Sequence, residues 1–363
     1  MSQISIIIPL FNRCVLIKET LDSLLWQTFQ DWECIIVDDG STDNSIEVIN
    51  KYLKTDNRFK LIIRDRLPKG APTCRNIGLS SAVSEFVMFF DSDDIFMPWC
   101  LEGRMKGIAE NADFDAYFSQ GLMVYKEKEP KFRANSEVVD YLLEIANFRT
   151  SIPTSSPTWR KSFLSKKIFW LEGLPRWQDP VFHVNCLVQN VKYIWIQKTP
   201  DHLIRSDYTD KTRITGSAGS FSVFDQLLKG FIGVYSILPE KYKNDFKSSI
   251  INKVWKVSFF LTKIQIINIK SMLIKADLMS KKEATLFEWL SLINLKFKKT
   301  PILRGLAYNL ILTRIKNETD NNKENKISDH ILEEFNNNVR EFCSNEILLR
   351  LSQFNLQLRN NHN

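Results

Sequence analysis

The sequence predicts an α/β fold with a mostly parallel sheet flanked by helices, followed by an α-helical extension. Over the first hundred residues, short and wholly apolar segments alternate with segments of helical spacing, which is typical of a parallel sheet covered on both faces. From about residue 221 the spacing is almost wholly helical. The 363 residues are 44% hydrophobic and include only 12 Gly and 12 Pro, which indicates a large globular core and excludes a collagen-like chain.

The elements of the first hundred residues follow from their residue types. β-Branched and aromatic runs predict strands, and apolar positions three or four residues apart predict helices. The expected strands are residues 4–8, 34–37, 61–63 and 86–90, and the expected helices are residues 15–29, 45–53 and 73–83.

Beyond residue 97 the alternation loosens. We expect a strand at 117–125, a helix near 138–146, a Thr/Ser/Pro loop at 150–158 and a strand at 191–197, which together complete the same domain in antiparallel fashion. The predicted organisation is an α/β domain at 1–220, a basic helical region at 221–317, and a linker with an amphipathic C-terminal helix at 318–363.

The net charge of +7 is unevenly distributed. Residues 1–220 contain 27 basic and 28 acidic residues, whereas residues 221–317 contain 17 basic and 6 acidic ones. Such a basic segment suits an anionic membrane surface, an acidic acceptor or a partner protein, and it also suits a solvated Lys-rich helical surface. We expect peripheral contact with an anionic membrane through 221–317 and a homodimer through the C-terminal helix, and we expect no nucleic-acid partner.

The sequence offers no membrane-spanning segment or signal peptide. A spanning helix needs about 18 apolar residues in a row. The longest stretches without Asp, Glu, Lys or Arg are residues 1–12 and 180–191, and the apolar N-terminus lacks a basic leader. The six cysteines are scattered without metal-ligand spacing. We therefore expect a cytoplasmic protein with reduced thiols.

Acidic residues follow two of the predicted strands. Asp38 and Asp39 end the second strand, and Asp91, Ser92, Asp93 and Asp94 follow the fourth. The carboxyl ends of neighbouring parallel strands meet at one sheet edge, where ligands bind. A divalent cation, Mg²⁺ or Mn²⁺, would offset such a cluster because hard cations prefer oxygen ligands. The alternative is that these residues cap the following helices, although two acidic pairs favour a site.

Arg75 lies in the turn before the fourth strand. Its guanidinium could neutralise a phosphate, or it could form a structural salt bridge with Asp39 or Asp91. Neither GxGxxG nor GxxxxGK[ST] follows any strand, and the sequence has no nucleophile elbow and no HExxH motif. The simplest interpretation is a phosphate-bearing ligand held through a metal ion.

Five sequence motifs occur in a recognisable order along the chain. They are Ile6-Ile7-Ile8-Pro9-Leu10-Phe11-Asn12-Arg13, Leu25-Trp26-Gln27-Thr28-Phe29, Ile36-Val37-Asp38-Asp39-Gly40-Ser41-Thr42-Asp43, Gly70 with Arg75-Asn76-Ile77-Gly78, and Phe89-Phe90-Asp91-Ser92-Asp93-Asp94. Together they closely resemble the inverting glycosyltransferases of family 2, which have the GT-A fold. The resemblance covers about residues 1–215 and says little about 221–363.

The resemblance implies roles for the donor-side residues. Asp39 would hydrogen-bond the nucleotide base, and the backbone at Pro9 together with Asn12 would line the same site. Arg75 would lie near the nucleotide or diphosphate. Within the Asp-x-Asp motif, Asp91 and Asp93 would bind the metal, Asp93 foremost, and Ser92 and Asp94 would complete the nucleotide-sugar site.

The resemblance also implies a general base. In the family this is usually the Asp of a Glu-Asp pair, and here the match is Gln178-Asp179, with Gln in place of Glu. Asp179 would deprotonate the acceptor hydroxyl, and the alternative is that it only caps the helix that begins near Pro180. His202 and Arg205 are weaker candidates for residues that close over the diphosphate.

The predicted activity is transfer of a sugar from a nucleotide sugar, by resemblance a UDP-sugar, to a saccharide or lipid-linked saccharide in surface-polysaccharide assembly. A sugar nucleotidyltransferase is one alternative, which the missing Gly-rich phosphate loop and the presence of Asp38-Asp39 with Arg75-Asn76 argue against. A non-catalytic nucleotide- or carbohydrate-binding module is the other, which the presence of Asp39, Asp93 and Asp179 argues against.

Overall fold

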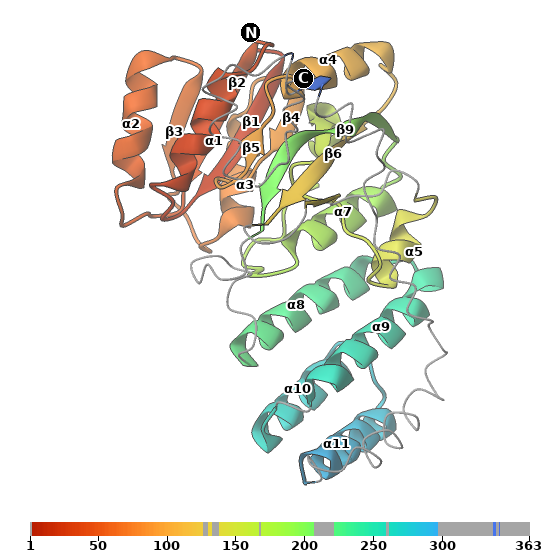
Figure 1. Cartoon of the computed structure of the whole chain (residues 1–363). Coiled ribbons are helices and arrows are strands. Elements are labelled where there is room, and N and C mark those ends of the chain that lie inside the picture. Colours follow the sequence, from red (N-terminus) through yellow and green to blue (C-terminus); the bar gives the residue numbers. More distant parts are fainter. Residues whose placement is uncertain are drawn as a thin grey trace, which may run out of the picture.

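A computed structural model describes residues 2–296, with gaps at 126–129, 133–137, 167, 207–220 and 259–260, together with residues 337, 338 and 341. Its N-terminal part is an α/β domain, and its C-terminal part is a set of helices (Figure 1). The predicted linker and C-terminal helix at 318–363, and the dimer expected through that helix, lie outside the described residues apart from these three positions.

One sheet forms the centre of the α/β domain, in the strand order β3-β2-β1-β4-β8-β6-β9-β5, with β7 paired to β6. The strands β1, β2, β3 and β4 are parallel to one another, as predicted. The strands are β1 (Ile4–Leu10), β2 (Trp32–Asp38), β3 (Phe59–Ile63), β4 (Phe86–Phe89), β5 (Ile95–Phe96), β6 (Ala116–Val124), β7 (Lys131–Phe132), β8 (Pro157–Arg160) and β9 (Tyr193–Arg205).

Helices cover both faces of this sheet because the parallel strands are apolar on both sides. In β1, Ile6 and Ile8 belong to one apolar cluster with Leu21 of α1, while Ile7 belongs to a second cluster with Cys74 of α3. The helices of this domain are α1 (Leu16–Leu25), α2 (Ser45–Thr55), α3 (Ala71–Ser81), α4 (Cys100–Glu110), α5 (Tyr141–Ala146), α6 (Lys161–Leu164) and α7 (Gln178–Val188).

The second half of the sheet differs from the expectation in two ways. The predicted loop at 150–158 overlaps β8, which begins at Pro157 and pairs antiparallel with both β4 and β6. Proline is tolerated at the first position of a strand, and Thr158 and Trp159, which follow it, are residue types that favour strands. The expected antiparallel completion is only partly correct for β9, which pairs antiparallel with β5 but runs parallel to β6 and extends to Arg205. The sheet as a whole is therefore mixed.

Beyond residue 220 the described residues up to 296 are mainly helical, as predicted. This region contains α8 (Phe221–Ile237), α9 (Glu240–Ser258), α10 (Lys263–Lys275) and α11 (Lys281–Lys296). These helices lie on the side of the domain that carries α5 and α7 (Figure 1). No helix in the described part of the chain is long and apolar enough to cross a membrane.

Helix α7 joins the two parts through its two apolar faces. Phe182 and Cys186 belong to the sheet-side cluster, whereas Val181 and Val184 share a cluster with Phe231 and other residues of α8–α11. Gly230 of α8 makes the approach possible, since a Cβ there would lie 2.4 Å from Cβ of Trp177, next to the first turn of α7.

Candidate active site

The loops that follow β1, β2 and β4 leave the sheet at one edge. Leu10 at the end of β1 pairs with Asp38 at the end of β2, and the amide of Asp39 donates to the carbonyl of Leu10 at 2.8 Å. The amide of Phe90 donates to the carbonyl of Ile7 at 3.0 Å, which places the residues after β4 beside them. Pro9 lies one residue earlier, buried in β1 opposite Val37.

Asn12 ties the first of these loops to the second. Its Oδ1 accepts the amide of Thr42 at 2.7 Å, and its own amide donates to Oγ of Ser41 at 3.0 Å. The φ of Asn12 is 50°, a left-handed conformation that asparagine adopts more readily than most residues. Asp38 folds the second loop locally, because its carboxylate accepts the amides of Gly40 and Ser41. Both loops are thus held by short side chains at the strand ends.

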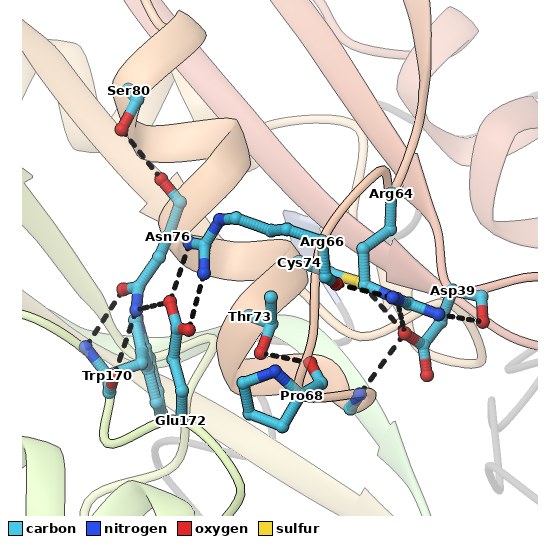
Figure 2. Close-up of polar contacts among 11 residues, drawn as sticks. Asp39, Arg64, Arg66, Pro68, Thr73, Cys74, Asn76, Ser80, Trp170 and Glu172 are labelled. Carbon is cyan, nitrogen blue, oxygen red and sulfur yellow. Dashed lines mark hydrogen bonds and ion pairs between the residues drawn. The ribbon is translucent and has the colours of Figure 1, made fainter.

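Asp39 is buried and paired with Arg64, the residue that follows β3. Figure 2 shows the guanidinium of Arg64 against the Asp39 carboxylate, which also accepts the amide of Gly70 at 3.1 Å. A buried carboxylate needs such partners to offset the loss of water around it. The Sγ of Cys74 lies 3.7 Å from the same carboxylate, and burial together with Asp39 raises the pKa of this thiol to about 12. Cys74 is therefore a protonated thiol and not a nucleophile.

Arg75 connects the Asp-x-Asp motif to helix α7. Its Nη2 contacts Oδ1 of Asp91 at 2.7 Å, its Nη1 donates to Oε1 of Gln178 at 3.0 Å, and its guanidinium stacks on Trp170 at 4.3 Å. The structural salt bridge that the sequence left open is thus present for Asp91 and absent for Asp39. The Arg75 side chain is only 4% exposed. It therefore holds Asp91 and Gln178 in place from the protein interior and reaches little into solvent.

Ser92, Asp93 and Asp94 follow β4 and are buried. Nε of Arg13 lies 3.9 Å from Oδ2 of Asp93. Asp94 accepts the amide of Arg205 at 3.0 Å through Oδ1, and its carbonyl accepts the hydroxyl of Thr20. Arg205 therefore meets this motif through its backbone, while its side chain pairs with Glu19.

The oxygen donors after β4 suit a hard divalent cation only in part. Among the residues that the structure describes, no three His, Cys, Asp or Glu side chains are grouped to hold a metal ion. Asp91 is 42% exposed and Asp93 is 10% exposed at their side chains, so the protein offers two carboxylates. This set fits a cation that takes its remaining ligands from water and from substrate phosphates, as Mg²⁺ often does.

Asp179 lies in the first turn of α7 and is half-buried. Its Oδ1 accepts a hydrogen bond from the hydroxyl of Thr154 at 2.5 Å. The residue before the helix, Trp177, has φ 61°, and Gln178 donates to the carbonyl of Leu174 at 3.0 Å. One network runs from Gln178, the neighbour of Asp179 in the sequence, through Arg75 to Asp91 of the Asp-x-Asp motif.

His202 does not join this network, contrary to the expected role over the diphosphate. It is fully buried, and its Nδ1 lies 2.6 Å from Oδ1 of Asp201. Arg104 of α4 completes this buried group with an ion pair to Asp201 at 2.7 Å. Burial raises the pKa of Asp201, but the charge of Arg104 and a hydrogen bond with His202 outweigh it and lower this pKa to about 2, while burial lowers the pKa of His202. The predicted strand ended at residue 197, whereas β9 extends to Arg205 and includes His202, which is fully buried.

The sequence analysis missed Arg64 and Thr154. Arg64 directly follows a predicted strand of the parallel sheet, so its position at the carboxyl edge was a usable signal. Thr154 lies in the predicted Thr/Ser/Pro loop, and only the fold reveals that it contacts Asp179, 25 residues later.

The α/β architecture places acidic residues at the carboxyl edge of the sheet, where ligands bind in open α/β folds. Residues 5–170 match the sequence profile of Glycosyl transferase family 2, and this part of the chain is a glycosyltransferase family 2 domain. An uncharacterised glycosyltransferase of Haemophilus influenzae is 34% identical over 142 residues, which are 39% of this chain and 56% of that protein.

Another relative matches over a shorter stretch, and a solved structure matches at lower sequence identity. The GalNAc(5)-diNAcBac-PP-undecaprenol beta-1,3-glucosyltransferase of Campylobacter jejuni is 36% identical over 106 residues, 29% of this chain and 34% of that enzyme. The chain therefore spans about half or less of the length of these two curated relatives. The crystal structure of S. aureus TarS 1–349 in complex with UDP-GlcNAc has a TM-score of 0.58 at 21% identity, covering 81% of this chain and 88% of that one. This likeness supports the GT-A fold.

Proposed function

We propose that this protein is an inverting, metal-dependent glycosyltransferase that moves a sugar from a nucleotide-sugar donor to a saccharide or lipid-linked saccharide in surface-polysaccharide assembly. The observation that carries the proposal is the Arg75 bridge, because one guanidinium links Asp91 of the Asp-x-Asp motif to Gln178, the neighbour of Asp179. This link supports the proposal that a donor-side carboxylate and the candidate base serve the same site.

Each residue has a task in this reaction. Asp39 binds the nucleotide base in an orientation fixed by Arg64, and Asn12 holds the adjoining loops in place. Asp179 takes the proton of the acceptor hydroxyl as its oxygen attacks the anomeric carbon from the face opposite the leaving group. Asp93 and Asp91 would hold Mn²⁺ or Mg²⁺, which offsets the charge of the departing nucleoside diphosphate when bound.

The proposed donor is a UDP-sugar, and the proposed acceptor class includes lipid-linked saccharides. The TarS complex with UDP-GlcNAc and the undecaprenol-linked substrate in the name of the Campylobacter enzyme motivate these choices. Cytoplasmic UDP-sugars and a lipid-anchored acceptor would require the protein to work at the membrane surface.

Helix α10 offers a surface for that contact. Ile264 and Ile267 are 72% and 42% exposed, and Lys263 and Lys275 on the same helix are also exposed. Apolar side chains flanked by lysines suit the interface of an anionic membrane. We expect the protein to cosediment with vesicles containing phosphatidylglycerol and to do so less after Ile264→Ser with Ile267→Ser. Equal sedimentation of the double variant would contradict this surface.

A nucleotide panel tests the proposed activity. Thermal unfolding would be followed with UDP, GDP, CDP and their sugars, each with and without Mn²⁺, because a ligand that binds the native state raises its apparent stability. We expect UDP and a UDP-sugar to raise the unfolding temperature only with metal, and Asp39→Asn to abolish that rise. A shift independent of metal would remove the role given to Asp93, and no shift with any nucleotide would contradict the proposed function.

A further inference from the structure

The hydroxyl of Thr154 is directed at the candidate base. It donates to Oδ1 of Asp179 at 2.5 Å, and Thr154 itself is only 3% exposed. We infer that Thr154 is a positioning residue for Asp179: its hydroxyl fixes the rotation of the carboxylate that receives the acceptor proton. This inference rests on the proposed glycosyl transfer, in which Asp179 acts as the base.

The loop that carries Thr154 is held rigidly from the opposite side. Nη2 of Arg104 donates to the carbonyl of Ser155 at 2.9 Å, and the hydroxyl of Ser156 donates to the carbonyl of Ser119 on β6. The amide of Ser119 returns a bond to the carbonyl of Ser156 at 3.1 Å. Because both residues after Thr154 are fixed to the buried side of the sheet, its hydroxyl has little freedom to leave Asp179.

Arg104 is in turn held by a buried ion pair. Its guanidinium contacts both carboxylate oxygens of Asp201, at 2.7 and 3.0 Å. A chain of contacts therefore runs from β9 through Arg104 and the 154–156 loop to Asp179 on α7. A misplaced reacting group can cost about a hundredfold in rate, so this support is large enough to matter for catalysis.

The titration of Asp179 in wild type and variant must be compared with the surrounding charged and titratable groups unchanged. Arg75 on α3 reaches Gln178, Asp91 faces Arg75, Arg104 on α4 lies behind the loop, and His183 is one turn further along α7. Burial lowers the pKa of His183 to about 3, so its imidazole is neutral at working pH. None of these groups changes when the Thr154 hydroxyl is removed.

Three variants separate positioning from packing. Thr154→Val keeps the shape of the side chain and removes the hydroxyl, Thr154→Ser restores a hydroxyl, and Thr199→Val makes the same change at an equally buried site on β9. With UDP-sugar and Mn²⁺, we expect Thr154→Val to lower kcat about tenfold to a hundredfold with an unchanged donor KM. The kcat of Thr154→Ser should stay within about threefold of the wild-type value, and the kcat of Thr199→Val should equal the wild-type value.

A measurement on the carboxylate itself does not depend on turnover. Titration of ¹³C-labelled aspartate carboxyls by NMR, with the Asp179 signal assigned from Asp179→Asn, should show a midpoint about one pH unit higher in Thr154→Val, since the hydrogen bond favours the ionised form. An unchanged midpoint, or equal loss of activity in Thr154→Val and Thr199→Val, would overturn the inference. If wild type turned over no nucleotide sugar, the proposed function would fail, and the titration would still decide the Thr154 contact.

Discussion

The proposed donor edge, formed by the loops after β1, β2 and β4, and the proposed base side around Asp179 are built differently. At the proposed donor edge, the loops after β1 and β2 are held by short side chains at the strand ends, Asp38 and Asn12. On the base side, Asp179 depends on a loop 25 residues earlier, and that loop depends on a buried ion pair between α4 and β9. The helices α8–α11 pack against α7 on this second side.

This difference indicates how the two proposed tasks, donor binding and deprotonation of the acceptor, can vary separately. The proposed nucleotide site, formed by strand ends, follows from the sheet itself, whereas the surroundings of the proposed base follow from long-range packing. Changes in the helical extension or in the 154–156 loop could therefore alter the acceptor side while the donor edge stays intact.

The largest effect on stability is expected from Arg104→Met. The change leaves the Asp201 carboxylate buried without its guanidinium partner, and breaking a buried ion pair in this way costs about 3–5 kcal/mol. Urea unfolding monitored by circular dichroism would measure the loss. The matched control is Arg149→Met, because Arg149 pairs with Glu144 at the surface and should change stability by about 1 kcal/mol or less. Similar losses in both variants would show that Arg104 does not support the base side.

A smaller, pH-dependent effect is expected at His183 on α7. Burial and the charge of Arg75 lower the pKa of its imidazole from 6.5 to about 3, so the unfolded chain binds a proton that the folded protein excludes between these values. Stability should therefore fall as the pH drops below 6.5, by about 2 kcal/mol from this group at pH 5. Unfolding of wild type and His183→Phe at pH 7 and pH 5 would measure it. The variant should lose about 2 kcal/mol less on acidification, and an equal loss would contradict a neutral His183.

The smallest effect is expected from Gln178→Glu, which restores the acidic residue common in the family. The new carboxylate would pair with Arg75 and place a second negative charge beside Asp179. Like charges raise each other's pKa, so the acid limb of kcat/KM should move up by about one pH unit, with donor KM unchanged. Gln189→Glu, at the far end of the same helix, serves as the control. An unmoved acid limb would mean that a negative charge at position 178 does not affect Asp179.

The sequence predicted the donor edge better than the base side for a physical reason. The strands before Asp38 and Asp91 are short apolar runs, and their carboxyl ends must meet once the strands are parallel. The loop at 150–158 instead contains half of β8, and the burial of His202 depends on Arg104, which is 98 residues away. Residues joined by such distant contacts leave no local pattern, and neither Thr154 nor Arg104 stood out before the fold was known.

The most direct test of the account is a paired measurement of donor binding and sugar transfer in Asp179→Asn. A general base contributes about 10²–10⁴ in rate, while the donor edge does not include Asp179. We expect the variant to bind UDP-sugar and Mn²⁺ with wild-type affinity by calorimetry and to lose transfer by at least about a hundredfold. Transfer at the wild-type rate with donor binding intact would contradict the assignment of Asp179 as the base.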